Sequence, residues 1–386
     1  MVIDFDSQIL IPKGDVGDFA AIACDQFSSQ PEYWNNLKTE LKAQSALDLI
    51  LPECFLDEAE ERLPLIREMS EDMLIGGRFT AVKGTVAVTR TTPYGRVRHG
   101  LVAAINLDDY EYTAGNTALI RASERTIQER IPPRVAIREA IDIELPHILL
   151  LVDDRKNAIK KAVDAAQKTP LYDGDLKGGG GHITGELIAP RDTAPLKKAV
   201  FDIIAESEKK FGTKLFALVG DGNHSLATAK HCRDTSPNPY NGYALVELVN
   251  IYDDGLVCEP IHRLVKTDDP ALFLDGLRLA VNGTAVTTAH ANGTVSINVP
   301  EDKIQAIKEV DNYCEAYVEL FGGSVEYVHG DDALVREGCV GIKMRGVEKF
   351  ELFNYVVKNG TLPKKTFSLG EAEEKRYYIE ARIIRE

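Results

Sequence analysis

The amino-acid sequence predicts an α+β fold, because hairpin signals and helix–strand crossover units both occur along it. Residues 80–91 and 96–106 alternate in polarity on either side of a turn at residues 92–95 that contains proline and glycine, a pattern typical of a β-hairpin. From residue 133 to residue 266, short apolar runs alternate with amphipathic stretches of helical length.

The N-terminal elements follow from apolar spacing. Residues 19–24 form a short apolar run that predicts a buried strand. Residues 29–32 have capping-box spacing with proline in the first turn, so a helix is expected through Tyr33, Trp34, Leu37 and Leu41. A second amphipathic helix is expected over about residues 57–73.

The middle of the chain alternates helices with strands, after a polar stretch at residues 108–133 that shows neither period. A helix is expected to begin at Pro133 and to end before Pro146, and Gly212 is placed to end a later helix. The expected helices are residues 155–168, 194–210 and 225–232, and the expected strands are residues 147–152, 178–188, 215–219, 243–251 and 256–265.

A linker is expected at residues 267–270, where two aspartates precede a proline. The sequence therefore predicts a catalytic region over residues 1–266 and an α+β region over residues 267–386. We expect the second region to pack back on the site of the first.

Composition restricts the classes of partner. The 386 residues are 44% hydrophobic and 27% charged, which is ordinary for a globular protein, and the formal net charge is −15. That charge argues against nucleic acid and anionic membranes as partners, because both require basic surfaces. No apolar run approaches 18 residues, and six cysteines without a CxxC pair favour a reducing compartment, so a cytoplasmic location is expected.

The most informative motif is the turn Gly220-Asp221-Gly222-Asn223-His224-Ser225, between an expected strand and an expected helix. Its glycines allow a sharp turn and close approach of a ligand, and the N–H groups at the start of the helix form an anion site. Asp221 is a candidate ligand for Mg²⁺ or a proton acceptor, and His224 a candidate donor to a phosphoryl oxygen. The competing interpretation is an ordinary strand-to-helix turn capped by Ser225 or Asn223.

Arginines are concentrated in a second segment: Arg121, Arg125, Arg130, Arg134 and Arg138. Guanidinium groups suit bidentate contacts with phosphate, and Glu124 among them is a candidate to accept a hydroxyl proton. The alternative is a solvated face paired with neighbouring carboxylates. Near the C-terminus, Lys364 and Lys365 stand beside hydroxyl side chains and a glycine, and Lys375-Arg376-Tyr377-Tyr378 follows. An exposed basic loop before a final strand is the simpler interpretation of this basic stretch.

Several familiar catalytic motifs do not occur in the sequence: a GxSxG elbow, HExxH, a Walker A loop and the HRD and DFG pair of protein kinases. The glycine run at residues 178–181 lacks the Lys-Ser/Thr ending of a phosphate loop, so a flexible hairpin turn is expected there instead.

Together, these segments resemble a bacterial family known as domain of unknown function ten-fifteen. The matching pieces keep their order along nearly the whole chain: Ala23-Cys24-Asp25, residues 120–126, residues 130–134, Glu144-Leu145-Pro146-His147, Asp221-Gly222-Asn223-His224-Ser225 and residues 363–370.

Many relatives in this family carry Asp-Gly-His-His-Arg at the turn, which is similar to the phosphate motif of the ParB/sulfiredoxin-like fold and its free-serine kinases. The resemblance therefore implies a ParB/sulfiredoxin-like core with a mixed sheet. It also implies phosphorylation of a small hydroxy compound, foremost free L-serine, with pyrophosphate, ADP or ATP as donor. This chain has Asn223 in place of the first histidine and Ser225 in place of the arginine, so the arginine cluster is expected to supply the missing positive charge.

The predicted phosphotransferase assigns a role to each residue. Asp221 would hold Mg²⁺, Glu124 would orient or deprotonate the acceptor hydroxyl, and His224 would stabilise the transferring group. The phosphate-binding set is Arg121, Arg130, Arg134, Arg138, Gly222, Asn223, Ser225, Lys364 and Lys365. Two alternatives stay open: a phosphoserine phosphatase, and a nucleotide-binding regulator without turnover.

Overall fold

The computed structural model describes residues 1–28, 30–126 and 131–385 of the chain. The chain divides into two compact units. Unit 1 contains Met1–Leu256, Val357–Gly360 and Ala372–Glu386, and unit 2 contains Val257–Val356 and Thr361–Glu371. The chain thus leaves unit 1 about ten residues before the boundary predicted at residue 266, and its last segment belongs to unit 1. The predicted packing of the C-terminal region on the site stays a prediction.

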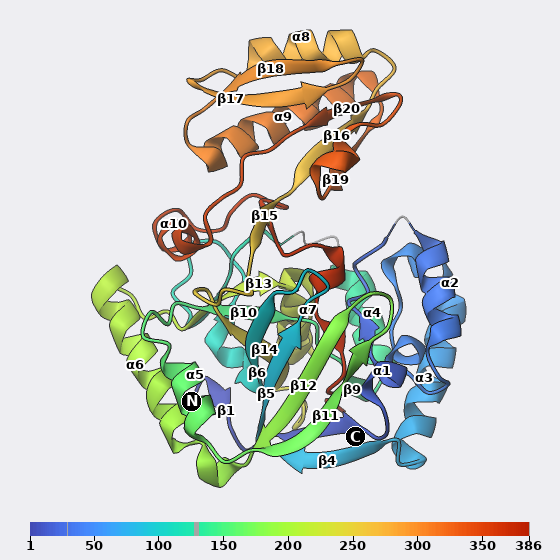
Figure 1. The fold of residues 1–386 in the computed structure, drawn as a ribbon, viewed down its shortest axis with the longest axis vertical. Coiled ribbons are helices and arrows are strands. Elements are labelled where there is room, and N and C mark those ends of the chain that lie inside the picture. Colours follow the sequence, from blue (N-terminus) through green and yellow to red (C-terminus); the bar gives the residue numbers. More distant parts are fainter. Residues whose placement is uncertain (29, 127–130, 386) are drawn as a thin grey trace. The chain divides into compact units, whose positions relative to one another are not determined.

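Unit 1 is built on one ten-stranded mixed sheet, as the α+β prediction requires (Figure 1). The strand order is β11-β12-β5-β6-β14-β10-β13-β8-β7, with β1 paired to β6 off this path. The strands are β1 (Ile3–Asp4), β5 (Thr85–Thr91), β6 (Val97–Asn106), β7 (Tyr110–Glu111), β8 (Ile120–Ala122), β10 (Leu149–Val152), β11 (Thr169–Leu176), β12 (Gly181–Ile188), β13 (Ala217–Asp221) and β14 (Tyr243–Asn250). Whether this is a ParB/sulfiredoxin-like core stays a prediction.

Both faces of the sheet are covered, because alternate residues of its central strands point to opposite sides. On β6, Leu101, Ala103 and Ile105 pack with α5 (Ala158–Ala165), α6 (Ala194–Phe211) and α7 (Asn223–Thr235). Val102 and Ala104 face the opposite core, which includes residues of α1 (Val16–Phe19), α2 (Pro31–Glu40) and α3 (Ala59–Ile75).

Three short strand pairs complete this unit around α4 (Ile131–Ala140). They are β2 (Gln8–Pro12) with β4 (Phe79–Lys83), β3 (Ala21–Ile22) with β22 (Tyr377–Tyr378), and β9 (Ile143–Glu144) with β23 (Arg382–Ile383). The last two pairs bring the end of the chain beside segments from its first 144 residues, so the C-terminal strands are integral to unit 1.

Unit 2 has an antiparallel five-stranded sheet with the order β18-β17-β20-β16-β19. Its elements are β15 (Cys258–Pro260), β16 (His262–Lys266), α8 (Pro270–Ala280), β17 (Ala285–His290), β18 (Thr294–Val299), α9 (Lys303–Phe321), β19 (Ser324–Val328), β20 (Cys339–Ile342) and β21 (Phe367–Leu369). Helix α10 (Leu352–Asn359) contains the crossing back to unit 1. Among the described residues, no helix combines the length and apolar character that a membrane span requires.

Most predicted elements are confirmed. The hairpin forms from β5 and β6, paired from Val86–Val102 to Thr91–Val97. The glycine run closes the hairpin of β11 and β12, as expected. Two predicted strands are wrong. The apolar run at residues 19–24 contains the end of helix α1 and only two strand residues, and the expected strand at residues 256–265 is split into β15 and β16.

Candidate phosphate site at the β13–α7 turn

The turn between β13 and α7 is organised by Gly222, whose φ of 78° lies in the left-handed region. A Cβ at this position would lie 2.9 Å from Cγ1 of Ile148, which is too close for a non-bonded contact. Only glycine therefore fits this position without a shift of Ile148. Helix α7 then begins at Asn223 with no side-chain cap. The predicted cap by Ser225 or Asn223 is therefore absent, because the residue that precedes the helix is Gly222, which has no side chain to accept from the first turn of α7.

The carboxylate of Asp221 is held on both of its oxygens. Oδ1 accepts a hydrogen bond from the N–H of Gly222 at 3.0 Å, and Oδ2 lies 3.0 Å from the ammonium of Lys375. The Lys375 side chain is 6% exposed and that of Asp221 is 20% exposed, so the ion pair is largely shielded from water. This arrangement places a lysine ammonium beside the start of α7.

A chain of polar groups leads from α7 into the core. Oγ of Ser225 lies 3.3 Å from Nε2 of His147, and Nδ1 of the same ring lies 2.8 Å from the hydroxyl of Tyr378. That hydroxyl also lies 3.1 Å from Sγ of Cys24. An imidazole nitrogen accepts more strongly than a thiol sulfur, so we assign the Tyr378 proton to Nδ1 of His147 and the ring proton to Nε2, which donates to Oγ of Ser225.

Burial keeps the inner end of this chain uncharged. It raises the pKa of the Cys24 thiol to about 11, with the charge of Asp25 as the next contribution and Arg134 acting in the opposite direction. Burial also raises the pKa of Tyr378 well above its ordinary value, followed by the effect of Cys24. Both groups are therefore neutral near pH 7 and orient His147 by hydrogen bonds alone.

Strand β8 reaches the same turn. It runs parallel to β13, with Ala122 opposite Val219, so Ser123 emerges beside the end of β13. Nδ2 of Asn223 donates to Oγ of Ser123 at 3.5 Å. Oδ1 of Asn223 is buried and has no hydrogen-bond partner among the described residues, so this amide holds an unused acceptor next to the turn.

Arg121 does not belong to this group. It is 5% exposed, and its guanidinium donates to the carbonyls of Ala118 and Lys214 and to the hydroxyl of Thr213. Thr213 and Lys214 precede β13, whereas Asp221 ends it, so the arginine is occupied at the opposite end of that strand. Burial lowers its pKa. The structure gives Arg121 a supporting role between two loops.

Two more of these arginines, Arg134 and Arg138, also have protein partners. Arg138 donates to Oε2 of Glu144 at 2.6 Å, and Oε1 of that carboxylate accepts from Arg382 at 2.7 Å. Arg134 forms an ion pair with Glu53, whose backbone N–H donates to the carbonyl of Cys24. Arg134 thus lies close enough to the Cys24 end of the site for its charge to act on the Cys24 thiol. Arg130 lies outside the described residues.

The remaining predicted residues fall into two places. Glu124 follows Ser123 and is half-buried, and His224 is the second residue of α7, so both lie along the segments that meet at the turn. Lys364 and Lys365 belong to unit 2, where Lys364 lies 2.7 Å from Oε1 of Glu315 and the Lys365 carbonyl accepts from Arg263.

Asp221 does not fit the predicted Mg²⁺ site. A magnesium ion takes oxygen ligands in octahedral geometry, whereas an ammonium and an N–H group already engage this carboxylate. Within the described ranges, no group of three histidine, cysteine, aspartate or glutamate side chains is arranged to hold a metal ion. Asp221 is instead the anchor of Lys375.

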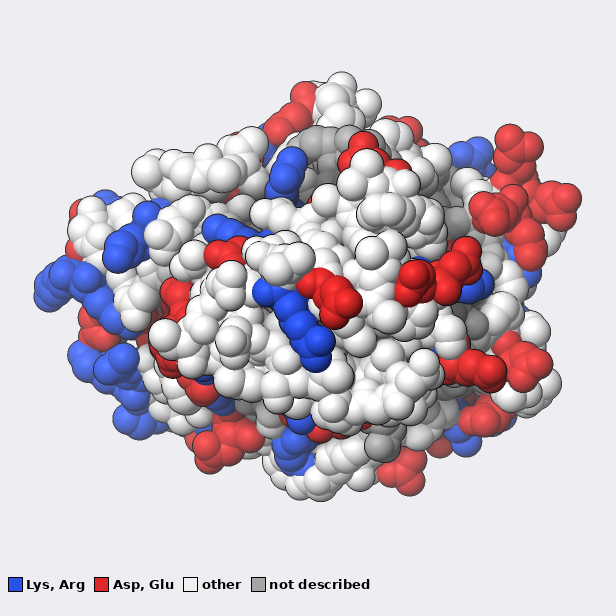
Figure 2. All heavy atoms as spheres, turned by 90° about the horizontal axis from the view of Figure 1, so that it is seen from above, with Lys and Arg blue, Asp and Glu red and all other residues white. Residues whose placement is uncertain are grey.

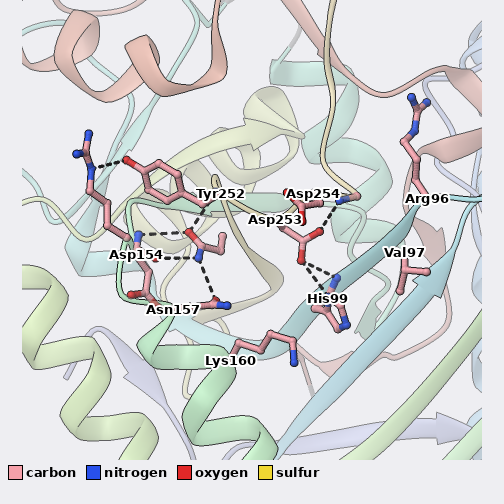
Figure 3. A pocket seen from close by; sticks show the side chains of 12 residues that line it. Arg96, Val97, His99, Asp154, Asn157, Lys160, Tyr252, Asp253 and Asp254 are labelled. Atoms are coloured by element: carbon pink, nitrogen blue, oxygen red, sulfur yellow. Dashed lines mark hydrogen bonds and ion pairs between the residues drawn. The ribbon is translucent and has the colours of Figure 1, made fainter.

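A cavity of unit 1 lies elsewhere, beyond the carboxyl ends of β10 and β14 (Figure 3). Its volume is about 530 Å³. Strand pairing puts Asp221 opposite Leu149, at the start of β10, whereas Asp154 of the cavity follows the end of β10. The cavity and the turn are therefore at opposite ends of the same strands. On the face drawn in Figure 2, acidic and basic side chains are interspersed among uncharged ones.

Sequence reasoning missed four residues of this site: Cys24, His147, Lys375 and Tyr378. All four lie in segments that the family resemblance or the C-terminal basic stretch had already singled out, but no role followed from them. Their convergence is tertiary, since 231 residues separate His147 from Tyr378. The one sequence signal that could have indicated these residues is that the segments resembling the family keep their order along nearly the whole chain.

Comparisons with known proteins place the chain in a family. A family model described as "Protein of unknown function (DUF1015)" matches residues 7–320, which is more than half of the chain. No curated protein matches it.

Solved structures are similar only at a distance. "SbnI with C-terminal truncation from Staphylococcus aureus" is 13% identical with a TM-score of 0.39, over 70% of this chain and 82% of that one. "Conserved hypothetical protein from Pyrococcus furiosus" is 11% identical with a TM-score of 0.39, over 72% and 90%. "Free serine kinase in complex with AMP" is 11% identical with a TM-score of 0.38, over 74% and 91%. Likenesses of this size do not assign a site or an activity.

Proposed function

The chain belongs to the family described as "Protein of unknown function (DUF1015)", and from this premise we propose that it is a phosphotransferase acting on a small hydroxy compound. The observation that carries the proposal is the uncapped start of α7 with the Lys375 ammonium beside it. N–H groups at a helix start together with a cation form a site for a phosphoryl group. Phosphoryl transfer is mostly positioning and charge stabilisation, so such a site is sufficient without a covalent nucleophile.

The phosphate contacts are assigned to the turn and not to the arginine cluster. The backbone N–H groups that follow Gly222 donate to the phosphoryl oxygens. The ammonium of Lys375 offsets the negative charge of these oxygens. The Ser225 hydroxyl takes the place of the arginine common among relatives. Its Oγ accepts from Nε2 of His147, which leaves its own proton to donate to a phosphoryl oxygen. Asn223 presents its buried amide oxygen to a hydroxyl of the bound substrate.

Proton transfer is assigned to residues that flank the phosphate contacts. Glu124 accepts the proton of the acceptor hydroxyl, and His224 donates a hydrogen bond to the transferring group. The acceptor oxygen forms a bond to phosphorus as the bond to the donor's leaving oxygen breaks. The motif resemblance to free-serine kinases makes free L-serine the first acceptor, and pyrophosphate, ADP and ATP the first donors.

The test is to incubate the purified full chain with L-serine and each donor, with and without Mg²⁺, and to follow phosphoserine by phosphorus NMR. We expect phosphoserine with at least one donor, and a loss of about 100-fold in kcat/KM for Ser225→Ala, the size typical of removing one preorganised donor. Thr235→Ala is the matched control, because Thr235 is an exposed hydroxyl residue at the other end of α7.

The same experiment separates the alternatives. Release of phosphate from phosphoserine without a donor would identify a phosphatase. Tight nucleotide binding without turnover, unaffected by Asp221→Asn, would identify a regulator. Absence of turnover with every donor would contradict the serine-kinase proposal.

A further inference from the structure

The segment that carries Lys375 is held by its backbone carbonyls. Those of three consecutive residues each accept a hydrogen bond from a buried guanidinium. Arg90 donates through Nη1 to the carbonyl of Lys375 at 2.6 Å and through Nη2 to that of Glu373 at 2.8 Å. Arg98 donates through Nη1 to the carbonyl of Glu374, between them, at 3.2 Å. Bonds at three successive residues fix the path of the main chain, and with it the point from which the Lys375 side chain starts.

The two arginines lie opposite each other on the β5–β6 hairpin. Arg90 of β5 pairs in register with Arg98 of β6, so both side chains leave the same face of the sheet. They are 1% and 3% exposed. Like charges directly opposite each other destabilise a strand pair. The hairpin itself gains nothing from this pair of charges, so the contribution of the pair lies in the carbonyls that the guanidiniums hold.

Glu247, the carboxylate beside this pair, is bonded to a third arginine. Its Oε2 accepts from Nε of Arg376 at 2.9 Å, whereas its Oε1 is 3.9 Å from Nε of Arg98, beyond hydrogen-bond reach. That Nε atom has no hydrogen-bond partner among the described residues. Arg90 directs Nε and Nη2 to the carbonyl of Gly180, at 3.2 and 2.7 Å. Arginines that balance charge pair with carboxylates, whereas these two are directed to main-chain carbonyls.

Both ends of the Lys375 residue are thereby fixed. Its carbonyl accepts from Arg90, and its ammonium lies 3.0 Å from Oδ2 of Asp221, beside the start of α7. A free lysine side chain has many rotamers, and ordering it at the moment of binding costs conformational entropy. A lysine whose backbone and ammonium are placed beforehand avoids most of that cost, so the turn is preorganised for an anion.

We propose that Arg90 and Arg98 are positioning residues that hold Lys375 beside the start of α7, and that they act on a bound phosphoryl group only through it. The inference rests on the proposed function, because that function assigns the charge of the phosphoryl oxygens to Lys375. Neither guanidinium contacts the phosphate, since both are buried and donate to the main chain. Two residues of the β5–β6 hairpin therefore set the geometry of a site at the end of another strand, β13.

Acetylation of lysines in the folded full chain tests the position of Lys375 without any phosphate. Wild type, Arg98→Met and Arg90→Lys are treated briefly with N-hydroxysuccinimide acetate, and each lysine is measured by mass spectrometry. Arg90→Lys keeps the charge but loses the planar fork that bonds three carbonyls at once. Both variants are expected to raise the acetylation rate of Lys375 by about tenfold or more, because loss of a buried bond favours local opening. Lys156, with a side chain 71% exposed, is the internal reference, and its rate should not change.

Arg121→Met is the matched control, because Arg121 is also buried and donates to two main-chain carbonyls, at the other end of β13. It should leave the acetylation rate of Lys375 unchanged. An equal rise in Arg121→Met would mean that any loss of stability exposes Lys375. An unchanged rate in both Arg98→Met and Arg90→Lys would mean that these arginines do not hold it. Either outcome overturns the proposal.

Titration with inorganic phosphate tests the route of action. Arg98→Met is expected to weaken phosphate binding by about five- to tenfold in the wild-type background. When Lys375→Met is already present, the further loss should be less than about twofold, because a residue that acts through Lys375 is coupled to it. Equal losses in both backgrounds would overturn the proposal. A wild-type chain that binds no phosphate would contradict the proposed function, and the acetylation rates would still decide whether Arg90 and Arg98 hold Lys375.

Discussion

The ammonium of Lys375 lies 3.0 Å from Oδ2 of Asp221, although 154 residues separate them in the sequence. The adjoining Arg376 forms a buried ion pair with Glu247 at 2.9 Å. Strand β22 begins one residue later and pairs with β3. The C-terminal segment is therefore fixed on the sheet by several contacts, and Lys375 is held rigidly beside the start of α7.

Replacing Lys375 should separate stability from phosphate binding. Lys375→Met leaves a largely shielded carboxylate without its cation, so we expect a loss of about 2–4 kcal/mol in the free energy of unfolding. Adding Asp221→Asn removes the unpaired charge of the Asp221 carboxylate and should recover most of the lost free energy of unfolding. Phosphate binding at the turn should stay weak in both variants, which urea unfolding and titration with phosphate would measure. Recovery of binding in the double variant would contradict the role given to Lys375.

Gly222 offers a test of how closely the turn is packed. Gly222→Ala places a side chain on a left-handed residue, which costs about 1–2 kcal/mol, and also brings Cβ to 2.9 Å from Ile148. Gly212→Ala is the matched control: its φ is 71°, but a Cβ there meets nothing within 4 Å. We expect urea unfolding to show a larger loss at Gly222 by about 1–3 kcal/mol, the usual cost of overpacking. Equal losses would mean that Ile148 moves aside freely.

Arg121 should behave as a structural residue. Arg121→Met leaves the carbonyls of Ala118 and Lys214 without their donor, so we expect a loss of about 2–4 kcal/mol in stability. The affinity of the turn for phosphate should change by less than about twofold, since uncoupled sites are nearly independent. Parallel measurements of unfolding and of phosphate binding would decide the matter. A large loss of binding with normal stability would restore the role that the sequence predicted.

The fold was predictable where local physics decides it. The β5–β6 hairpin and helices α2, α3 and α6 follow from apolar period, turn residues and the Gly212 stop, and all appear in the structure. Strand β11 was not predicted, because Pro170 and Gly174 interrupt its pattern and half of its residues are exposed on a sheet edge. The short strands β7 and β8 lie in the stretch that shows neither period. There the pairing of β8 with β13, and of β7 with β8, creates the strands, and not local propensity.

The site was predictable only in part, because charge in a sequence does not say what will neutralise it. The Asp221 turn was identified from its glycines and its place between a strand and a helix, and the structure shows that geometry. Arg121 and Arg138 looked like phosphate ligands, yet each found protein acceptors on folding. Lys375 stood in a stretch that favoured an exposed loop, and only the pairing of β22 with β3 buries it at the turn.

Acid should expose the role of Arg138 and Arg382, which is to neutralise Glu144. Burial raises the pKa of Glu144, but Arg382, Arg138 and their hydrogen bonds outweigh it, and the net pKa is lowered. A lowered pKa in the folded state means that this carboxylate contributes stability above its unfolded pKa, near 4.3, and that the contribution is lost as pH falls through the folded value. Glu144→Gln leaves two arginines without their shared carboxylate, so we expect a loss of about 3 kcal/mol at pH 7. The difference between wild type and variant should shrink below about pH 4 in urea unfolding measured across pH. A difference that stays constant down to pH 2 would show that the ion pairs with Arg138 and Arg382 add nothing to stability.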